Sequence, residues 1–277
     1  MNAPAGFREA PAPYQAQVSG YSLAMSDRER GIFLYHGDCI EVMEAILRKH
    51  PQGCFDMIFA DPPYGLSNDG FTCVAGRAVS VNKGEWDRSG TLQDFVAFTW
   101  QWLSLCQKLL KKDGTIWVSG TRHNIYTVGH LMGELGLKIL NDIVWEKPNP
   151  PPNLSCRYFT HSTEIILWAA KGQKSRHQFN YAEMRLANAG KQMKSVWRIS
   201  PPGAIEKHFG KHPTQKPVAL LDRIICSSTG PGNFVFDPFS GSSTTGIASI
   251  KQGRAFCGVD SSQAYIDLSK MRLNMGD

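Results

Sequence analysis

The sequence predicts an α/β fold, in which a mostly parallel, twisted seven-stranded sheet carries helices on both faces. Three observations lead to this prediction. Short apolar runs of strand length alternate with stretches of helical length along most of the 277 residues. Four of the expected strands end at an acidic residue and a turn, as the ligand-binding edges of such sheets often do. The composition, 42% hydrophobic and 19% charged, is that of a globular chain with one large core.

The expected elements follow one another as strand and helix. In residues 39–50, Val42, Ile46 and Leu47 fall on one face of a helix. Asp113 and Gly114 are expected to end the helix over 91–112. The expected strands span residues 31–36, 55–60, 115–120, 138–147, 164–170, 233–237 and 255–260, and the remaining helices 124–135, 217–227, 243–252 and 262–273.

Two regions interrupt the alternation and define the expected domains. Residues 148–212 begin with a proline-rich stretch, continue with many basic residues, and are predicted to form a small recognition insert. The catalytic domain is expected to comprise 30–147 and 213–277, and residues 1–29 a loose N-terminal arm. Residues 65–90 are expected to be a long functional loop, a candidate clamp over a ligand.

Charge and cysteine usage exclude several classes of protein. The net charge of +6 is compatible with a polyanionic partner and equally with a mildly basic enzyme. Seven dispersed cysteines, with no CxxC pair, indicate reduced thiols and neither a disulfide framework nor a metal site. No apolar run approaches the ~20 residues of a membrane span, and the N-terminus has no secretory signal. A cytoplasmic protein is expected.

The four acids that end expected strands are the first candidates for function. They are Asp38, Asp61, Asp237 and Asp260. Any one of them can simply cap the helix that follows its strand. Because the carboxyl ends of parallel strands meet at one edge of a sheet, the four together favour a ligand site there.

The stretch DPFSGSSTTG after the sixth expected strand is typical of a nucleotide-binding turn. It has neither the lysine of a P-loop nor the spacing GxGxxG, which argues against a bound phosphate. Asp260 follows one strand and helix later, where an acid suits the diol of a ribose. The expected ligand is a nucleoside without a phosphate anchor.

Taken in order, the stretches GDCIEVM, DPPY, HPTQKP, DPFSGSSTT and GVD resemble the bacterial DNA amino-methyltransferases of the β-group. The resemblance spans residues 31 to 272. It implies a site-specific methyltransferase that uses S-adenosylmethionine and acts on double-stranded DNA. The resemblance also allows a second copy of the chain, in a homodimer, and a cognate restriction endonuclease as partners. It implies no association with a membrane.

The resemblance implies a role for each motif in cofactor binding. Asp38 and Cys39 of the GDC turn would lie near the cofactor's adenine, and Asp260 would bind its ribose. Lys216 would face the methionine carboxylate, where a cation is apt, although Lys216-Pro217 can also simply start a helix. Ser243 stands where the family usually has glycine. The remaining residues implied at the cofactor are Thr214, Gln215, Asp237, Phe239, Ser240, Gly241 and Ser242.

The DPPY motif implies the chemistry. The amino group of adenine is a poor nucleophile, and two acceptors aimed at its hydrogens would turn its lone pair toward the methyl group. Asp61 and the carbonyl of Pro62 would be these acceptors, with Pro63 stiffening the turn. Tyr64 would stack on the extruded base, a contact worth ~1–3 kcal/mol elsewhere. The alternative is an Asp-Pro-Pro turn that only closes a strand.

The family associates DPPY mostly with adenine N6 and SPPY mostly with cytosine N4. Three hypotheses therefore remain: an adenine-N6 enzyme, a cytosine-N4 enzyme, and a non-catalytic DNA-binding module. RNA or protein methylation is disfavoured, because the related motifs there usually begin with Asn. Basic residues of the expected insert would contact DNA, or would only be solvated. They are Lys147, Arg157, Lys174, Arg176, Lys191, Lys194 and Arg198.

Overall fold

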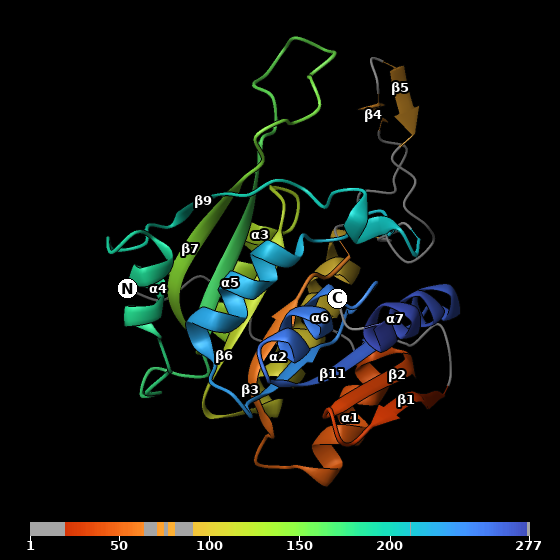
Figure 1. The fold of residues 1–277 in the computed structure, drawn as a ribbon, viewed down its shortest axis with the longest axis vertical. Coiled ribbons are helices and arrows are strands. Elements are labelled where there is room, and N and C mark those ends of the chain that lie inside the picture. Colours follow the sequence, from red (N-terminus) through yellow and green to blue (C-terminus); the bar gives the residue numbers. More distant parts are fainter. Residues whose placement is uncertain (1–19, 64–70, 75–76, 81–90, 211, 276–277) are drawn as a thin grey trace, which may run out of the picture.

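The computed structural model describes residues 20–63, 71–74, 77–80, 91–210 and 212–275. Within them, nine strands form one sheet and two more form a separate hairpin (Figure 1). Tyr64 and Trp86, and with them most of the expected loop 65–90, lie outside the described residues.

The centre of the sheet is parallel, as predicted. Its order is β2 (Ile32–Gly37), β11 (Ala255–Asp260), β10 (Phe234–Asp237), β3 (Phe55–Ala60) and β6 (Leu110–Gly120). All four pairings between these neighbours are parallel. The carboxyl ends of these strands therefore lie at one edge, which we call the catalytic edge.

Antiparallel strands flank this centre. β8 (Thr163–Ala170) pairs with β6, and β7 (Lys138–Glu146) pairs with β8. Four strands were not expected from the sequence: the hairpin strands within the expected loop 65–90, and two strands of the large sheet. β1 (Tyr21–Asp27) pairs with β2, and β9 (Val196–Arg198) pairs with β7, which makes nine strands instead of seven.

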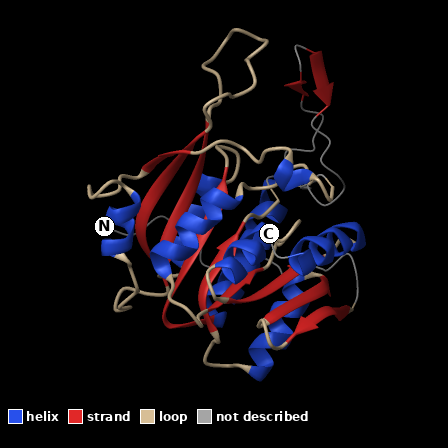
Figure 2. Cartoon of the chain, in the orientation of Figure 1, coloured by secondary structure: helices blue, strands red, loops and turns tan. Residues whose placement is uncertain are grey.

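Helices cover both faces of the sheet (Figure 2). Successive residues of β3 show the division: Ile58 packs in one apolar cluster, and Met57 and Phe59 in another. The first cluster contains buried residues of α1 (Cys39–Lys49), α2 (Leu92–Leu109) and α3 (Ile125–Glu134), and the second those of α5 (Val218–Ser228) and α6 (Thr244–Lys251). The other elements are α4 (Tyr181–Ala187), the 3-10 helix η2 (Ile205–Lys207), α7 (Gln263–Met275) and the hairpin of β4 (Phe71–Val74) and β5 (Arg77–Ser80).

Long-range pairings add to the sequence prediction at two places and correct it at a third. The expected arm 1–29 includes β1, which bonds to β2. The expected insert 148–212 contains β8, an interior strand of the sheet, which pairs with β6 and β7. The helix expected to reach Lys112 ends at Leu109, because Leu110 is buried and pairs with Phe55 of β3. None of the described helices is long and apolar enough to cross a membrane.

Candidate active site

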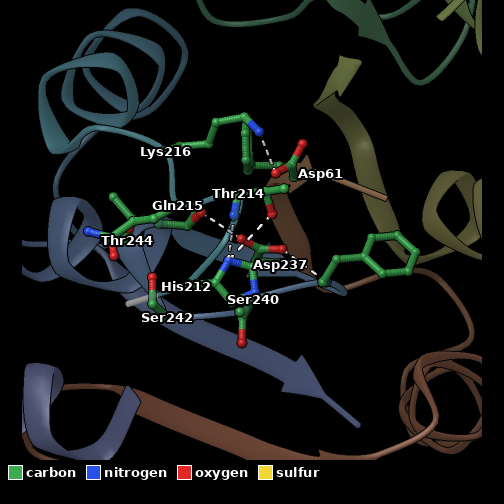
Figure 3. A pocket seen from close by; sticks show the side chains of 13 residues that line it. Asp61, His212, Thr214, Gln215, Lys216, Asp237, Ser240, Ser242 and Thr244 are labelled. Atoms are coloured by element: carbon green, nitrogen blue, oxygen red, sulfur yellow. Dashed lines mark hydrogen bonds and ion pairs between the residues drawn. The ribbon is translucent and has the colours of Figure 1, made fainter. Parts of the chain in front are cut away.

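The four predicted acids meet at the catalytic edge. Asp38 follows β2, Asp61 follows β3, and Asp237 and Asp260 end β10 and β11. A pocket lies at this edge between the turn after β10 and the segment before α5 (Figure 3). Its lining comprises Phe59, Asp61, His212, Thr214, Gln215, Lys216, Asp237, Phe239, Ser240, Gly241, Ser242, Thr244 and Thr245.

Hydrogen bonds from backbone N–H groups, and in one case a hydroxyl, hold three of these acids. Asp38 caps α1, because its Oδ1 accepts from the backbone N–H of Ile40 at 2.9 Å and of Glu41 at 3.3 Å. Asp260 accepts from Ser262 N at 2.8 Å and Gly241 N at 2.9 Å, so it ties the turn after β10 to the end of β11. The capping alternative is thus confirmed for Asp38, and it leaves the second oxygen of that carboxylate for a ligand.

Asp237 is the most buried of the four acids. Its carboxylate accepts from Phe239 N at 3.0 Å and from the hydroxyl of Thr245 at 2.5 Å. Burial outweighs these hydrogen bonds and raises the pKa of Asp237 to about 7. Burial likewise raises the pKa of Asp260 to about 6, and it raises the pKa of Asp38 as well.

In the turn after β10, Ser243 has the left-handed backbone conformation that favours the glycine usual at this position in the family. Ser243 has φ +55°, in the left-handed region that costs a residue with a side chain about 1 kcal/mol or more. Its hydroxyl donates to Ser269 Oγ at 2.9 Å, and Ser269 in turn donates to the carbonyl of Gly241 at 2.9 Å. Arg272 donates to the carbonyl of Ser242 at 2.5 Å. Helix α7 thus stabilises the strained turn.

The pocket fits the polar methionine part of S-adenosylmethionine. Ser240 Oγ and Gln215 Oε1 are buried, line the pocket and have no hydrogen-bond partner within the described residues. Such atoms require a polar partner. At Gly241, a Cβ would lie 3.1 Å from Nε2 of His212, so the turn approaches this ring closely. Gly241 also has φ +51°, where glycine is favoured.

Charge pairs, in contrast, hold Asp61. Its Oδ2 lies 2.5 Å from Nζ of Lys216, which also lies 3.4 Å from Oε2 of Glu164. The other oxygen of Glu164 lies 2.5 Å from Nζ of Lys147. Burial alone would raise the pKa of Glu164, but the ammonium groups of Lys216 and Lys147 outweigh burial and lower it.

This network gives two lysines partners that the sequence does not predict. Lys216, which is expected to face the methionine carboxylate, has its ammonium between Asp61 and Glu164, because acids at the ends of β3 and β8 both approach it. Lys147, which is expected to contact DNA, pairs with Glu164. Both expected ligand contacts stay predictions. The alternative for Lys216-Pro217 also holds, since α5 begins directly after Pro217.

The remaining residues of the motifs occupy varied positions. The side chain of Cys39 is buried in the core, which leaves its main chain for a cofactor. Thr214 lies beside His212, with 3.4 Å between Oγ1 and Nδ1, and Gln215 donates to Glu206 O at 2.8 Å. Pro62 is buried and Pro63 is half-buried at the end of β3.

The basic residues predicted to bind DNA do not gather on one surface. Lys174 and Arg176 follow β8 at the edge opposite the active site, where Arg176 N donates to Asp113. Lys191 and Lys194 lie between α4 and β9, and Arg198 lies 3.8 Å from Glu146 at the end of β7. Arg157, exposed on the segment between β7 and β8, and Arg198, exposed at the end of β9, lie at the catalytic edge.

Sequence reasoning missed Glu164, His212, Ser269 and Arg272. Glu164 was counted only as the start of an apolar strand, although a carboxylate in such a run is a signal of a buried charge pair. His212 begins the HPTQKP stretch. The hydroxyl and guanidinium of α7 carry no local signal, because their partners lie 26 to 30 residues away.

The fold and the site together define a class of protein: an α/β enzyme with a nucleoside-cofactor pocket beside a charge-paired carboxylate. Comparison with known families is consistent with this class. A family model described as "DNA methylase" matches residues 55–271. The chain belongs to this DNA methylase family.

Individual relatives agree. The chain is 50% identical over 244 residues to the type II methyltransferase M2.MboI of Moraxella bovis, and the match covers 88% of each chain. It is 49% identical over 243 residues to the type II methyltransferase M2.DpnII of Streptococcus pneumoniae, covering 87% of this chain and 89% of that one. The crystal structure of an M1.HpyAVI–SAM complex matches with a TM-score of 0.67 and 28% identity, over 88% of this chain and 99% of that one.

Proposed function

We propose that the protein is a site-specific DNA methyltransferase that transfers a methyl group from S-adenosylmethionine to N6 of adenine. The observation that carries the proposal is the carboxylate of Asp61, which lies at the wall of the cofactor pocket and is paired with Lys216 at 2.5 Å. A carboxylate paired with an ammonium stays ionised at neutral pH and can accept hydrogen bonds.

Asp61 and its neighbours orient the target amino group. The carboxylate of Asp61 and the carbonyl of Pro62 accept from the two N–H bonds of the base, so its lone pair points to the pocket. Pro62 and Pro63 restrict the backbone that carries this carbonyl, and thereby favour the reactive geometry. The bound cofactor supplies an electrophilic methyl group on sulfur, and no covalent enzyme intermediate is needed.

Two of the other acids, Asp38 and Asp260, hold the cofactor, and Asp237 lines the pocket beside them. Asp38 retains an oxygen for the adenine amino group, and Asp260 lies where it can accept from the ribose hydroxyls. Ser240, whose hydroxyl lacks a partner within the described residues, faces the methionine part together with the main chain of Gly241. Thr214 and Gln215 complete this wall of the pocket.

Adenine is favoured over cytosine by the aspartate that begins the DPPY motif. The cytosine-N4-specific PvuII methyltransferase shares the fold, with a TM-score of 0.70 at 18% identity, so the fold alone does not choose the base. The test is methylation of duplex DNA with labelled cofactor, followed by nucleoside analysis. The proposal predicts N6-methyldeoxyadenosine; N4-methyldeoxycytidine as the sole product would establish the alternative.

Duplex DNA would bind at the catalytic edge, where the segment between β7 and β8 projects beyond the sheet (Figure 1). We call residues 148–162 the projecting loop. It exposes Leu154, Tyr158 and Phe159 by 53%, 59% and 97%, beside the exposed Arg157. Exposed apolar side chains next to a cation suit a base step and its phosphate. Lys174 and Arg176, at the opposite edge, are not part of this proposed surface.

The type II relatives also bear on the cellular role. We propose that the enzyme protects cytoplasmic host DNA beside a cognate restriction endonuclease, since the relatives M2.MboI and M2.DpnII are named type II methyltransferases. Sequencing of modified bases in DNA from a host that expresses the protein would give the recognition site. Sedimentation at micromolar concentration would establish whether the protein is a homodimer.

A further inference from the structure

Glu164 lies in the active site but comes from outside the nucleoside-binding half of the sheet. It is the second residue of β8, an antiparallel strand, whereas the four predicted acids end the parallel strands. Its side chain is 11% exposed and contacts two lysines. It does not line the cofactor pocket, and the proposed methyl transfer does not use it.

Four side chains form a continuous line of alternating charge. Lys147, Glu164, Lys216 and Asp61 are joined by distances of 2.5, 3.4 and 2.5 Å. The side chains of Lys216 and Asp61 are 5% and 12% exposed. Removing so many charges from water is costly, and apolar residues often replace such pairs without loss of stability. The line is therefore better explained by the reaction than by folding.

A rigid pair of strands supports the distal half of this line. Lys147 N donates to Ser162 O at 2.8 Å directly beyond the last paired residues, Glu146 and Thr163. Lys147 and Glu164 thus project from the ends of two strands that are fixed to each other. Lys216, in contrast, lies in the segment before α5, outside regular structure. Glu164 gives its ammonium a fixed partner.

We infer that Glu164 is a positioning residue, which holds the ammonium of Lys216 beside the carboxylate of Asp61. Lys147 offsets part of the negative charge of Glu164, and the two residues together set the electrostatic potential at Asp61. This inference rests on the proposed function. When the target amino group approaches Asp61, the shared ammonium can lean toward Glu164, 3.4 Å away, without leaving the site. Asp61 then stays ionised and oriented. It also remains a strong hydrogen-bond acceptor for the target amino group, because Lys216 is shared with Glu164 and does not pair with Asp61 alone.

Other charged groups face Asp61 and must be kept constant in any test. Asp237, at the end of β10, lies close enough for the charge of Asp61 to contribute to the raised pKa of Asp237. His212 lines the same pocket from the segment before α5. Substitution of Glu164 or Lys147 leaves both of these groups in place.

The inference predicts opposite effects for the two outer residues. In Glu164→Gln one negative charge is lost, so the two lysines act on Asp61 alone and its pKa falls. In Lys147→Met one positive charge is lost, Glu164 draws Lys216 away, and the pKa of Asp61 rises. Each change should move that pKa by roughly 0.5–1 and lower kcat about 10-fold or more. The double variant should return the pKa close to the wild-type value.

The experiment measures Asp61 directly and then the reaction. Protein labelled with ¹³C at the aspartate carboxyl carbons is titrated by NMR without cofactor or DNA, and Asp61 is assigned by comparison with Asp61→Asn. The pH dependence of kcat at saturating cofactor and DNA is then measured for the same variants. Lys111→Met is the matched control, because Lys111 pairs with Asp56 at 2.8 Å, 49% exposed and away from the pocket. It should leave both readouts unchanged.

Shifts of opposite sign that cancel in the double variant would support the inference. An unmoved Asp61 pKa, or equal losses of kcat with no change in its pH dependence, would overturn it. If Glu164→Gln does not fold, the upward shift in Lys147→Met still tests the sign. If the titrations follow the prediction but wild-type protein methylates no DNA, the charge coupling stands and the proposed function fails.

Discussion

The cofactor side and the target side of the catalytic edge hold their acids in different ways. On the cofactor side, Asp38 and Asp237 accept from backbone N–H groups two or three residues away. On the target side, Asp61 pairs with a lysine 155 residues away, and Glu164 with one 17 residues away. A turn supplies the first kind of partner, whereas only the assembled sheet supplies the second.

Because of this difference, carboxylates can serve both in binding a neutral ligand and in the methyl-transfer step. Burial raises the pKa of Asp237 and Asp260, whereas two lysines overcome burial and lower the pKa of Glu164. Carboxylates held by neutral donors suit a ligand whose hydroxyl or amino groups are neutral. A carboxylate paired with ammonium stays ionised, as the methyl-transfer step requires.

The largest effect is expected at Asp61. Asp61→Asn keeps the shape but removes the charge, so kcat should fall by about 10³-fold or more, while the cofactor dissociation constant changes less than about threefold. Methyl transfer with labelled cofactor and calorimetry would measure the two. A parallel loss of cofactor binding would mean that Asp61 belongs to the cofactor side.

The converse is expected at Asp260. Asp260→Asn should raise the cofactor dissociation constant about 10- to 100-fold, as for loss of a charged hydrogen bond, with little change in kcat at saturation. The pKa of Asp260 is about 6, so wild-type affinity should increase from pH 5 to 7 as the carboxylate ionises. Calorimetry across this range should find no such increase in the variant. An unchanged constant would remove Asp260 from the ribose site.

Asp237 should make stability depend on pH. Its pKa is about 7 in the folded protein and about 4 in an unfolded chain. The unfolded chain therefore loses its proton first, and the free energy of unfolding should fall by on the order of 2–4 kcal/mol between pH 4 and 7. Asp237→Asn should remove most of this decline in denaturant titrations. Asp222→Asn, at a surface pair with Lys251, is the control and should retain it.

A smaller effect is expected at the tip of the projecting loop. Phe159 is 97% exposed, so Phe159→Ala should leave stability and cofactor affinity unchanged. If the loop enters the DNA, the affinity for duplex should fall by about 1 kcal/mol, or fivefold. Leu186→Ala is the matched control, since Leu186 is 81% exposed on α4. Equal DNA affinity of the two variants in fluorescence anisotropy would exclude the loop.

The smallest effect is expected at Ser243. Ser243→Gly relieves the strain of φ +55° but loses the hydrogen bond to Ser269. Each is worth about 1 kcal/mol, so the free energy of unfolding should change by less than about 1 kcal/mol. Thermal unfolding and calorimetry would check this. A large gain in cofactor affinity would show that the serine weakens the turn.

The difference between local contacts and contacts of distant segments also explains which features could be predicted from the sequence. The parallel strands, the four acids at their ends and the turn after β10 were predicted correctly, because each depends on neighbouring residues. The resemblance to a DNA amino-methyltransferase is confirmed by the family match. β1 and β9 were missed, since one lies in an apparently irregular arm and the other has only three residues.

The target side was predicted less well, because its contacts join distant segments. Nothing near Lys216 in the sequence indicates that it meets Asp61 and Glu164. The DNA contact expected of Lys147 stays a prediction, and its pairing with Glu164 depends on the pairing of β7 with β8. Charged side chains in loops carry little positional information until the sheet that brings them together is known.

The most direct test is a structure of the protein with duplex DNA and a cofactor analogue that has no transferable methyl group. The measurement is the distance from the target base's amino nitrogen to the two expected acceptors. We expect adenine outside the helix, with N6 about 3 Å from the carboxylate of Asp61 and from the carbonyl of Pro62. An extruded base whose amino group contacts neither oxygen would contradict it.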